Sequence, residues 1–200
     1  MPFKAHLSKD KRLKPLIEKI DLPVLKKRKS IFLDLCGSIM SQQLSVKVAD
    51  VIYNRFVDLF DNDPNPEKII AIEHDALRSI GLSNAKANYV KNVAAFALER
   101  GLEFKQLNKM HNDAVIEYLT EIKGVGRWTA EMLMMFTLGR EDVFAADDLG
   151  IQTAMIKLYK LDAADKKALR QSMLQISQKW KPYRTYACMY LWRYKDGRTK

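Results

Sequence analysis

The feature that most constrains the fold is a segment at residues 119–130, where two helical patterns are separated only by the turn Lys123-Gly124-Val125-Gly126. Glycine permits positive φ angles and lets another molecule approach the bare backbone. The first turn of the second helix has backbone N–H groups without intrahelical partners and a partial positive charge. The segment therefore predicts a tight helical hairpin that carries a small anion site, suited to a phosphate.

The residues around the second glycine would form this anion site. The amides of Gly126, Arg127 and Trp128 can point at one phosphate group. The side chains of Lys123 and Arg127 add positive charge beside it. An ordinary glycine turn between helices is the alternative, but the helical patterns on both sides favour phosphate binding.

The overall charge also favours a polyanionic partner. The 200 residues include 34 Lys and Arg against 24 Asp and Glu, a net charge of +10. A basic surface of this kind suits nucleic acid, although it could serve solubility alone. The dense basic run at residues 26–29 could be a localisation signal or a phosphate contact, but a solvated helix face is the favoured interpretation.

The cysteines and the hydropathy of the chain indicate the cellular environment of the protein. Cys36 and Cys188 lie far apart in apolar surroundings, so we expect buried thiols, with a disulfide as the alternative. Two cysteines cannot supply the four ligands of an iron–sulfur cluster. The N-terminus does not resemble a signal peptide, and no apolar run approaches the ~20 residues of a membrane helix. We therefore expect a soluble, intracellular protein that does not associate with membranes.

Helical periodicity dominates the chain and predicts an all-α fold. A single short extended segment is expected, at residues 142–146, where Val143-Phe144-Ala145-Ala146 runs into two acids. Helical patterns occupy residues 31–59 (bent near 41–45), 66–72, 75–80, 85–100, 112–122, 129–138, 151–159, 163–180 and 183–194.

The two acids Asp147 and Asp148 stand immediately before a helical pattern. One interpretation is a simple helix N-cap, a position that aspartate favours. The other divides the roles, so that Asp147 starts the helix and Asp148 faces a cleft. There an ionised carboxylate could stabilise a developing sugar cation or activate a water.

Aromatic and amide side chains supply further candidates. Trp128 shares a helical face with Met132 and Met135, and aromatic residues crowd the last segment. Most of these are expected in the core, although an indole suits a flat cationic ligand. The pair Gln42-Gln43 interrupts an apolar helix, either as a polar helix contact or as a side chain that fills the hole left by an extruded base.

These residues together resemble the helix-hairpin-helix DNA glycosylase superfamily, and within it the 3-methyladenine-DNA glycosylase II branch. The matching core is residues 122–130 followed by Asp147-Asp148. Residues 41–45, 80–83 and 180–187 match other blocks of the family, so the resemblance covers about residues 31–192.

The resemblance implies two helical lobes flanking a cleft. One lobe would comprise residues 31–140 with the hairpin, and the other residues 1–30 with 141–200. It implies a monomer that acts on double-stranded DNA containing alkylated bases, in the nucleoid of a prokaryote or the nucleus of a eukaryote.

The family also implies roles for single residues. Asp148 matches the catalytic carboxylate, Trp128 and Trp192 match tryptophans of the base pocket, and Gln43 matches the side chain that enters the duplex. The hairpin residues 123–127 (Lys123, Gly124, Val125, Gly126 and Arg127) match the DNA contacts. The backbone carbonyls of Thr120, Ile122 and Val125 match those that hold a monovalent cation.

Three departures from the family pattern refine the expected activity. Lys123 replaces the usual proline, and Met132 replaces a pocket aromatic, which affects base selectivity. Trp128 stands where bifunctional members carry a nucleophilic lysine, and an indole cannot form a Schiff base. We therefore expect a monofunctional glycosylase for alkylated purines of the 3-methyladenine and 7-methylguanine type, with no iron–sulfur cluster. The alternatives are a bifunctional glycosylase/lyase for oxidised bases and a non-catalytic DNA-binding hairpin module.

Overall fold

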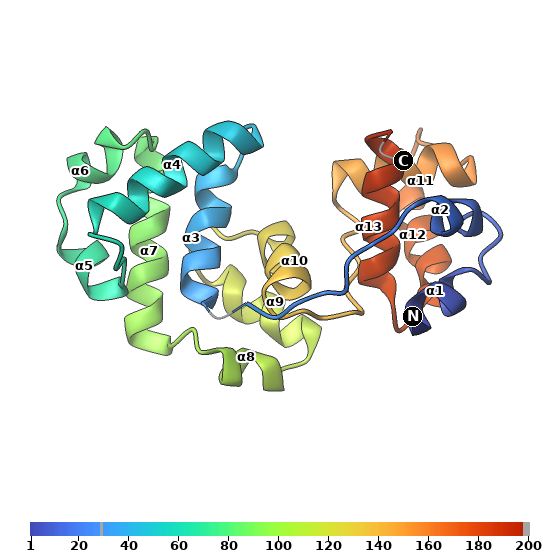
Figure 1. Cartoon of the computed structure of the whole chain (residues 1–200), viewed down its shortest axis with the longest axis horizontal. Coiled ribbons are helices and arrows are strands. Elements are labelled where there is room, and N and C mark those ends of the chain that lie inside the picture. Colours follow the sequence, from blue (N-terminus) through green and yellow to red (C-terminus); the bar gives the residue numbers. More distant parts are fainter. Residues whose placement is uncertain (29, 198–200) are drawn as a thin grey trace. The chain divides into compact units, whose positions relative to one another are not determined.

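A computed structural model describes residues 1–28 and 30–197, which form only helices and irregular connections (Figure 1). The all-α fold class predicted from the sequence is therefore confirmed. The helices are α1 (Pro2–Leu7), α2 (Lys14–Lys19), α3 (Ile31–Ser41), α4 (Val46–Leu59), α5 (Pro66–Ala71), α6 (His74–Ser79), α7 (Asn84–Arg100), α8 (Phe104–Lys109), α9 (Asn112–Thr120), α10 (Arg127–Phe136), α11 (Leu149–Tyr159), α12 (Lys166–Ser177), the 3₁₀ helix η1 (Gln178–Trp180) and α13 (Arg184–Lys195).

The chain divides into two compact units. The central unit is Lys27–Leu133, and the terminal unit joins Met1–Lys26 to Met134–Lys200. The sequence placed these boundaries at residues 30/31 and 140/141, whereas the second boundary of the structure falls inside α10. The last residues of α10 belong to the terminal unit, where the ring centroid of Phe136 lies 6.0 Å from that of Trp192.

The central unit is built around α7. This helix packs against α3, α5 and α6, and α3 also packs against α4. Serine side chains start α4 and α7, because Ser45 accepts a hydrogen bond from the amide of Val48 and Ser83 from that of Lys86. The bend between α3 and α4 falls where the sequence predicted it, at residues 42–45.

The terminal unit is organised around α13, which lies beside α11 and also contacts α2 (Figure 1). Its core holds three large aromatic side chains, Trp180, Tyr186 and Tyr190, each at most 1% exposed. Phe3 of α1 stacks on Tyr186 with ring centroids 3.8 Å apart. The first residues of the chain are thus packed against the last helix.

Two features of the local structure differ from what the sequence predicted. Residues 142–146 do not form a strand. This segment is held by Thr185 of α13, whose Oγ1 accepts from the Val143 amide at 3.0 Å and donates to the Arg140 carbonyl at 2.6 Å. The short helices α1, α2 and α8 were not anticipated from the sequence.

The described part of the basic run, residues 26–28, is not a helix face. Its described members lie in an irregular connection, where Arg28 pairs with Asp34 at 3.2 Å and the Lys27 ammonium lies 5.5 Å from the ring centroid of Phe104. Lys29 lies outside the described residues.

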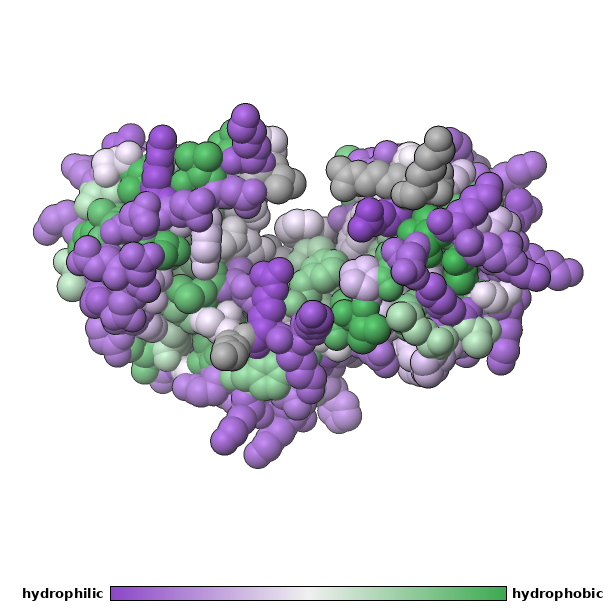
Figure 2. Space-filling model, viewed as in Figure 1, coloured by the Kyte–Doolittle hydropathy of each residue, from purple (hydrophilic) through white to green (hydrophobic). Residues whose placement is uncertain are grey.

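Both cysteines are buried and neither forms a disulfide, as the sequence indicated. In the part of the chain that the structure describes, no helix is both long and apolar enough to cross a membrane. Hydrophilic side chains cover much of the visible face of the molecule (Figure 2).

Candidate functional site

The helical hairpin predicted from the sequence is present in the central unit. α9 ends at Thr120 and α10 begins at Arg127. The two apolar residues of the turn anchor it, since Ile122 is 2% and Val125 5% exposed. The Val125 amide donates to the Ile122 carbonyl at 2.9 Å. The turn is therefore fixed by its own backbone and by the core beneath it.

Gly124 is required by the fold itself. Its φ is +106°, and a Cβ at this position would lie 2.3 Å from Cγ of Tyr89 on α7. Two side-chain amides hold the adjoining backbone. Asn92 Nδ2 donates to the Lys123 carbonyl at 3.0 Å, and Gln42 Nε2 donates to the Gly124 carbonyl at 3.4 Å. These contacts connect the hairpin to α7 and to the end of α3.

Gly126 has a different environment. Its φ lies outside the left-handed region, and a Cβ there would meet no atom within 4 Å. Neither backbone strain nor packing therefore demands glycine at this position. It is exposed just before α10, where the helix dipole attracts anions.

The charged residues of the hairpin differ in their contacts. Lys123 is exposed. Arg127 Nε donates to Oε1 of Glu131 at 3.0 Å, and the Glu131 side chain is only 2% exposed. Part of the Arg127 guanidinium therefore neutralises a buried carboxylate, a partner that the sequence analysis missed although it lies four residues along the same helix.

Thr120 is the last residue of α9, where the helix dipole is negative, and Ile122 and Val125 follow it in the turn. The Ile122 carbonyl accepts one hydrogen bond, from the Val125 amide, and a carbonyl oxygen has a second lone pair. This oxygen donor set fits a monovalent cation. Among the described residues, His, Cys, Asp and Glu nowhere gather in a group of three or more that could hold a metal ion.

The α10 residues predicted to line a base pocket lie at the surface of the central unit. Trp128 is 40% exposed and Met132 is half-buried. Met135, which shares their helical face by spacing, is fully buried and belongs to a core. An exposed indole at the start of a helix is unusual for a purely structural tryptophan.

Gln43 stands in a strained loop between α3 and α4. Its φ is +59°, a conformation that is uncommon for any residue other than glycine, and its side chain is exposed. The Lys86 ammonium holds the preceding turn by donating to the carbonyls of Met40 at 2.9 Å and Gln42 at 2.7 Å. Strain of this kind accumulates where a side chain must be presented for function.

In the terminal unit, Asp148 is the N-cap of α11. Its Oδ1 accepts a hydrogen bond from the Ile151 amide at 2.8 Å and another from Trp192 Nε1 at 2.9 Å. Asp148 is half-buried and Trp192 approaches it from α13. The structure thus brings together two of the residues that the sequence named separately.

The division of roles between the two acids needs correction. Asp148, not Asp147, caps the helix. Asp147 is exposed and forms an ion pair with Arg170 of α12, at 2.8 Å from Nε to Oδ1. The N-cap and cleft-facing interpretations were treated as alternatives for Asp148, but one carboxylate can cap a helix and still act on a ligand.

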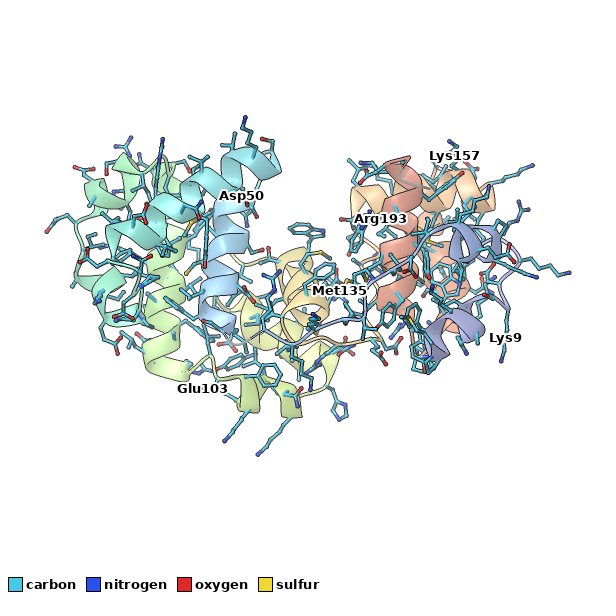
Figure 3. The ribbon with its side chains drawn as sticks, in the orientation of Figure 1. Lys9, Asp50, Glu103, Met135, Lys157 and Arg193 are labelled. Atoms are coloured by element: carbon cyan, nitrogen blue, oxygen red, sulfur yellow. The ribbon has the colours of Figure 1, made fainter. Side chains whose placement is uncertain are left out.

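Two further residues of this group were missed. Gly150 faces Asp148 and Trp192, because a Cβ built on it would lie 3.1 Å from Oδ1 of Asp148 and 3.1 Å from Cδ1 of Trp192. Phe136 contacts the Trp192 ring. Phe136 could have been found as the next turn of the Trp128–Met132 face, whereas nothing in the sequence connects Gly150 to Trp192. Figure 3 shows the helices involved, with Lys157 labelled on α11 and Arg193 on α13.

A glycine hairpin and a capped, indole-bonded aspartate on an all-helical scaffold define a helix-hairpin-helix protein with a carboxylate available for chemistry. The chain belongs to the HhH-GPD superfamily of base excision DNA repair proteins, whose family model matches residues 36–181. That range includes the hairpin and both acids, but not Trp192.

Curated relatives agree with this family. The chain is 36% identical to DNA-3-methyladenine glycosylase 1 of Schizosaccharomyces pombe over 169 residues, which are 83% of this chain and 73% of that protein. It is 33% identical over 171 residues to a putative DNA-3-methyladenine glycosylase of Bacillus subtilis. This match covers 82% of the chain and 58% of the longer relative.

Solved structures extend the likeness to the whole fold. The crystal structure of a Bacillus halodurans DNA-3-methyladenine glycosidase matches with a TM-score of 0.84 and 38% identity, over 98% of this chain and 89% of that one. The Schizosaccharomyces pombe 3-methyladenine DNA glycosylase in complex with abasic DNA matches with a TM-score of 0.84 and 32% identity, over 96% of both chains.

Proposed function

We propose that this chain is a monofunctional DNA glycosylase that hydrolyses the N-glycosidic bond of alkylated purines in double-stranded DNA and leaves an abasic site. The observation that carries the proposal is the Asp148 carboxylate, held in place by the Ile151 amide and the Trp192 indole. Its relatives named DNA-3-methyladenine glycosylase support the reaction and the substrate class.

The chemistry follows from the charge of the damaged base. Alkylation at N3 or N7 makes a purine cationic, so it leaves readily and needs no general acid. The barrier lies in the positive charge that develops on the sugar. Asp148 would stabilise this charge electrostatically and help to orient the attacking water. Trp128 and Trp192 would offer indole faces to the cationic base, with Met132 as a softer contact.

DNA binding is assigned to the hairpin and to the loop at Gln43. The amides at Gly126 and Arg127, together with the Lys123 side chain, would hold a phosphate. The carbonyls of Thr120, Ile122 and Val125 would hold a monovalent cation, which adds positive charge for the same backbone. The exposed side chain of Gln43 would fill the space left by the flipped nucleotide.

The partner in this proposal is DNA, bound by a monomer in the nucleoid or the nucleus. The net charge of +10 supports a polyanionic partner and predicts that binding weakens as salt rises. Trp128, which cannot form a Schiff base, favours hydrolysis over strand cleavage.

Chromatography of the bases released from methylated DNA tests the proposal. Release of 3-methyladenine or 7-methylguanine, without capture of a covalent complex by borohydride, is the expected result. Borohydride capture on DNA with an oxidised base would instead indicate a glycosylase/lyase. Salt-sensitive duplex binding without any base release would indicate a non-catalytic hairpin module. Either outcome would overturn the assignment.

A further inference from the structure

The glycine at position 150 has no local explanation. It is the second residue of α11, and its φ lies outside the left-handed region. Glycine in a helix is less favourable than alanine, so the backbone alone would prefer another residue. The surroundings supply a reason. A Cβ would lie 3.1 Å from Asp148 Oδ1 and from Trp192 Cδ1, closer than ordinary van der Waals contact.

The space beside Gly150 is filled by the indole of Trp192. Through this space Trp192 Nε1 reaches Asp148 Oδ1 at 2.9 Å. A methyl group at position 150 would have to move either the carboxylate or the indole by a few tenths of an ångström. The hydrogen bond therefore depends on the absence of a side chain on the neighbouring helix.

We propose that Trp192 and Gly150 are positioning residues for Asp148. The indole N–H fixes the carboxylate, and Gly150 provides the room in which it does so. This inference rests on the function proposed above. It gives Trp192 a role through its N–H, distinct from the aromatic surface that a base pocket would use.

Two hydrogen-bond donors constrain the Asp148 carboxylate more tightly than a single donor would. The Ile151 amide alone leaves the carboxylate plane free to rotate about the bonded oxygen. A second donor on the same oxygen, from the separate helix α13, defines that plane and with it the place of Oδ2. The ring of Phe136 contacts the Trp192 indole and helps to hold it in place. Such support matters because a displacement of 1 Å at a reacting group can cost about 10²-fold in rate.

Two substitutions separate the hydrogen bond from the other properties of these residues. Trp192→Phe keeps an aromatic ring but removes the N–H. Gly150→Ala keeps both partners but closes the space between them. We expect each to lower single-turnover excision from a methylated duplex by about 10-fold to 10²-fold. Affinity for an abasic duplex should stay within about twofold, because neither change removes a phosphate contact.

Stability provides the first control. Alanine is the better helix former, so Gly150→Ala should keep or raise the melting temperature while activity falls. If Gly150 had a purely structural role, the substitution would lower the melting temperature and the activity together.

Trp180 provides the matched variant. Its Nε1 also donates to a carboxylate, Oδ2 of the buried Asp10, at 2.9 Å. Trp180→Phe should lower the melting temperature yet excise at close to the native rate.

A direct readout does not depend on catalysis. The ¹H–¹⁵N resonance of the Trp192 indole, assigned by its loss in Trp192→Phe, should shift upfield in Gly150→Ala as the hydrogen bond lengthens. In a double-mutant cycle, Gly150→Ala should cost much less in the Trp192→Phe background than in the native protein, because the two changes remove one interaction.

Several results would overturn the inference. Native excision rates in Trp192→Phe or in Gly150→Ala would do so, as would multiplicative effects in the cycle or an unchanged indole resonance. These outcomes differ from a failure of the proposed function. In that case the unmodified protein itself would release no base from methylated DNA, and the positioning roles would fall with the activity.

Discussion

The Lys86 ammonium donates a hydrogen bond to the Gln42 carbonyl at 2.7 Å and thereby fixes the residue that precedes the strained Gln43. A second bond, to the Met40 carbonyl at 2.9 Å, satisfies the end of α3. Burial lowers the pKa of this lysine, yet its donors remain directed at the loop. The Lys86 side chain thus connects the end of α3 to Gln43, the residue proposed to enter the duplex.

Lys86→Met should therefore impair base flipping. Methionine retains the apolar stem but leaves two carbonyls without their donor, which we expect to cost about 2 kcal/mol of stability. Excision from a duplex should fall, and the fluorescence rise of a 2-aminopurine placed at the flipped position should shrink. Both are measured under single-turnover conditions at a temperature where the variant is folded.

Lys91 of the same helix provides the matched control. Its ammonium donates to the carbonyls of Ile70, at 3.3 Å, and Ile72, at 2.5 Å, at the end of α5. Lys91→Met should lose comparable stability without any change in flipping. Equal effects of the two variants on 2-aminopurine fluorescence would show that Lys86 does not act through the Gln43 loop.

The two glycines of the hairpin should respond differently to alanine. Gly124→Ala forces a methyl group into the Tyr89 ring at a φ of +106°, so we expect a large loss of stability. Gly126→Ala meets no protein atom. It should melt like the native protein but bind duplex DNA more weakly, because the methyl group obstructs the approach of a phosphate. Thermal melts and fluorescence anisotropy with a labelled duplex measure the two effects.

Lys123→Met extends this test to charge. If Lys123 contacts one phosphate, its removal should reduce the slope of log K against log[salt] by about 1. Gly126→Ala should leave that slope nearly unchanged, since it removes no charge. Native DNA affinity in both variants would place the phosphate elsewhere.

The adjacent acids provide a paired test of catalysis. Asparagine caps a helix as well as aspartate does, so Asp148→Asn should keep α11 and the fold. Excision should nevertheless fall by about 10²-fold to 10³-fold, since the negative charge facing the sugar is lost. Asp147→Asn breaks only the exposed pair with Arg170, worth at most about 1 kcal/mol, and should excise normally. Loss of activity in Asp147→Asn but not in Asp148→Asn would reverse the assignment.

The sequence predicted the helices and the hairpin well, because their signals are local. Gly124 and Gly126 mark the turn, and the bend before α4 appears where Gln42 and Gln43 interrupt an apolar pattern. The segment at residues 142–146 was expected to be extended but forms no strand, and Thr185, 42 positions along the chain, satisfies the Val143 amide.

The contacts that shape the candidate site were harder to predict, because they join residues far apart in the chain. Trp192 and Asp148 are 44 positions apart, and Lys86 lies 44 positions from Gln42. The helical periodicity of a sequence does not predict contacts between residues so far apart in the chain. Gly150 acts only through the space it leaves, a property that appears once the neighbouring helix is in place.

Asp10, a buried carboxylate far from Asp148 in the sequence, predicts how stability depends on pH. Burial acts to raise the pKa of Asp10, but hydrogen bonds from Trp180, Lys179, the Arg12 amide and Tyr159 outweigh it and lower the pKa below the ordinary value of 3.8. A carboxyl with a lowered native pKa stabilises the fold fully above its unfolded pKa. This contribution is lost as the pH falls from 3.8 towards the native value.

Asp10→Asn should remove that dependence. At pH 7 the variant should be less stable by about 2 kcal/mol, because the bonds to Lys179 and to the other donors lose their charge-assisted strength. Between pH 4 and the acid transition, its free energy of unfolding should change less steeply than that of the native protein. Urea titrations across this range measure both quantities. A variant with the native acid slope would mean that another carboxylate controls acid unfolding, since only a group whose proton affinity differs between the folded and unfolded chain can contribute to the slope.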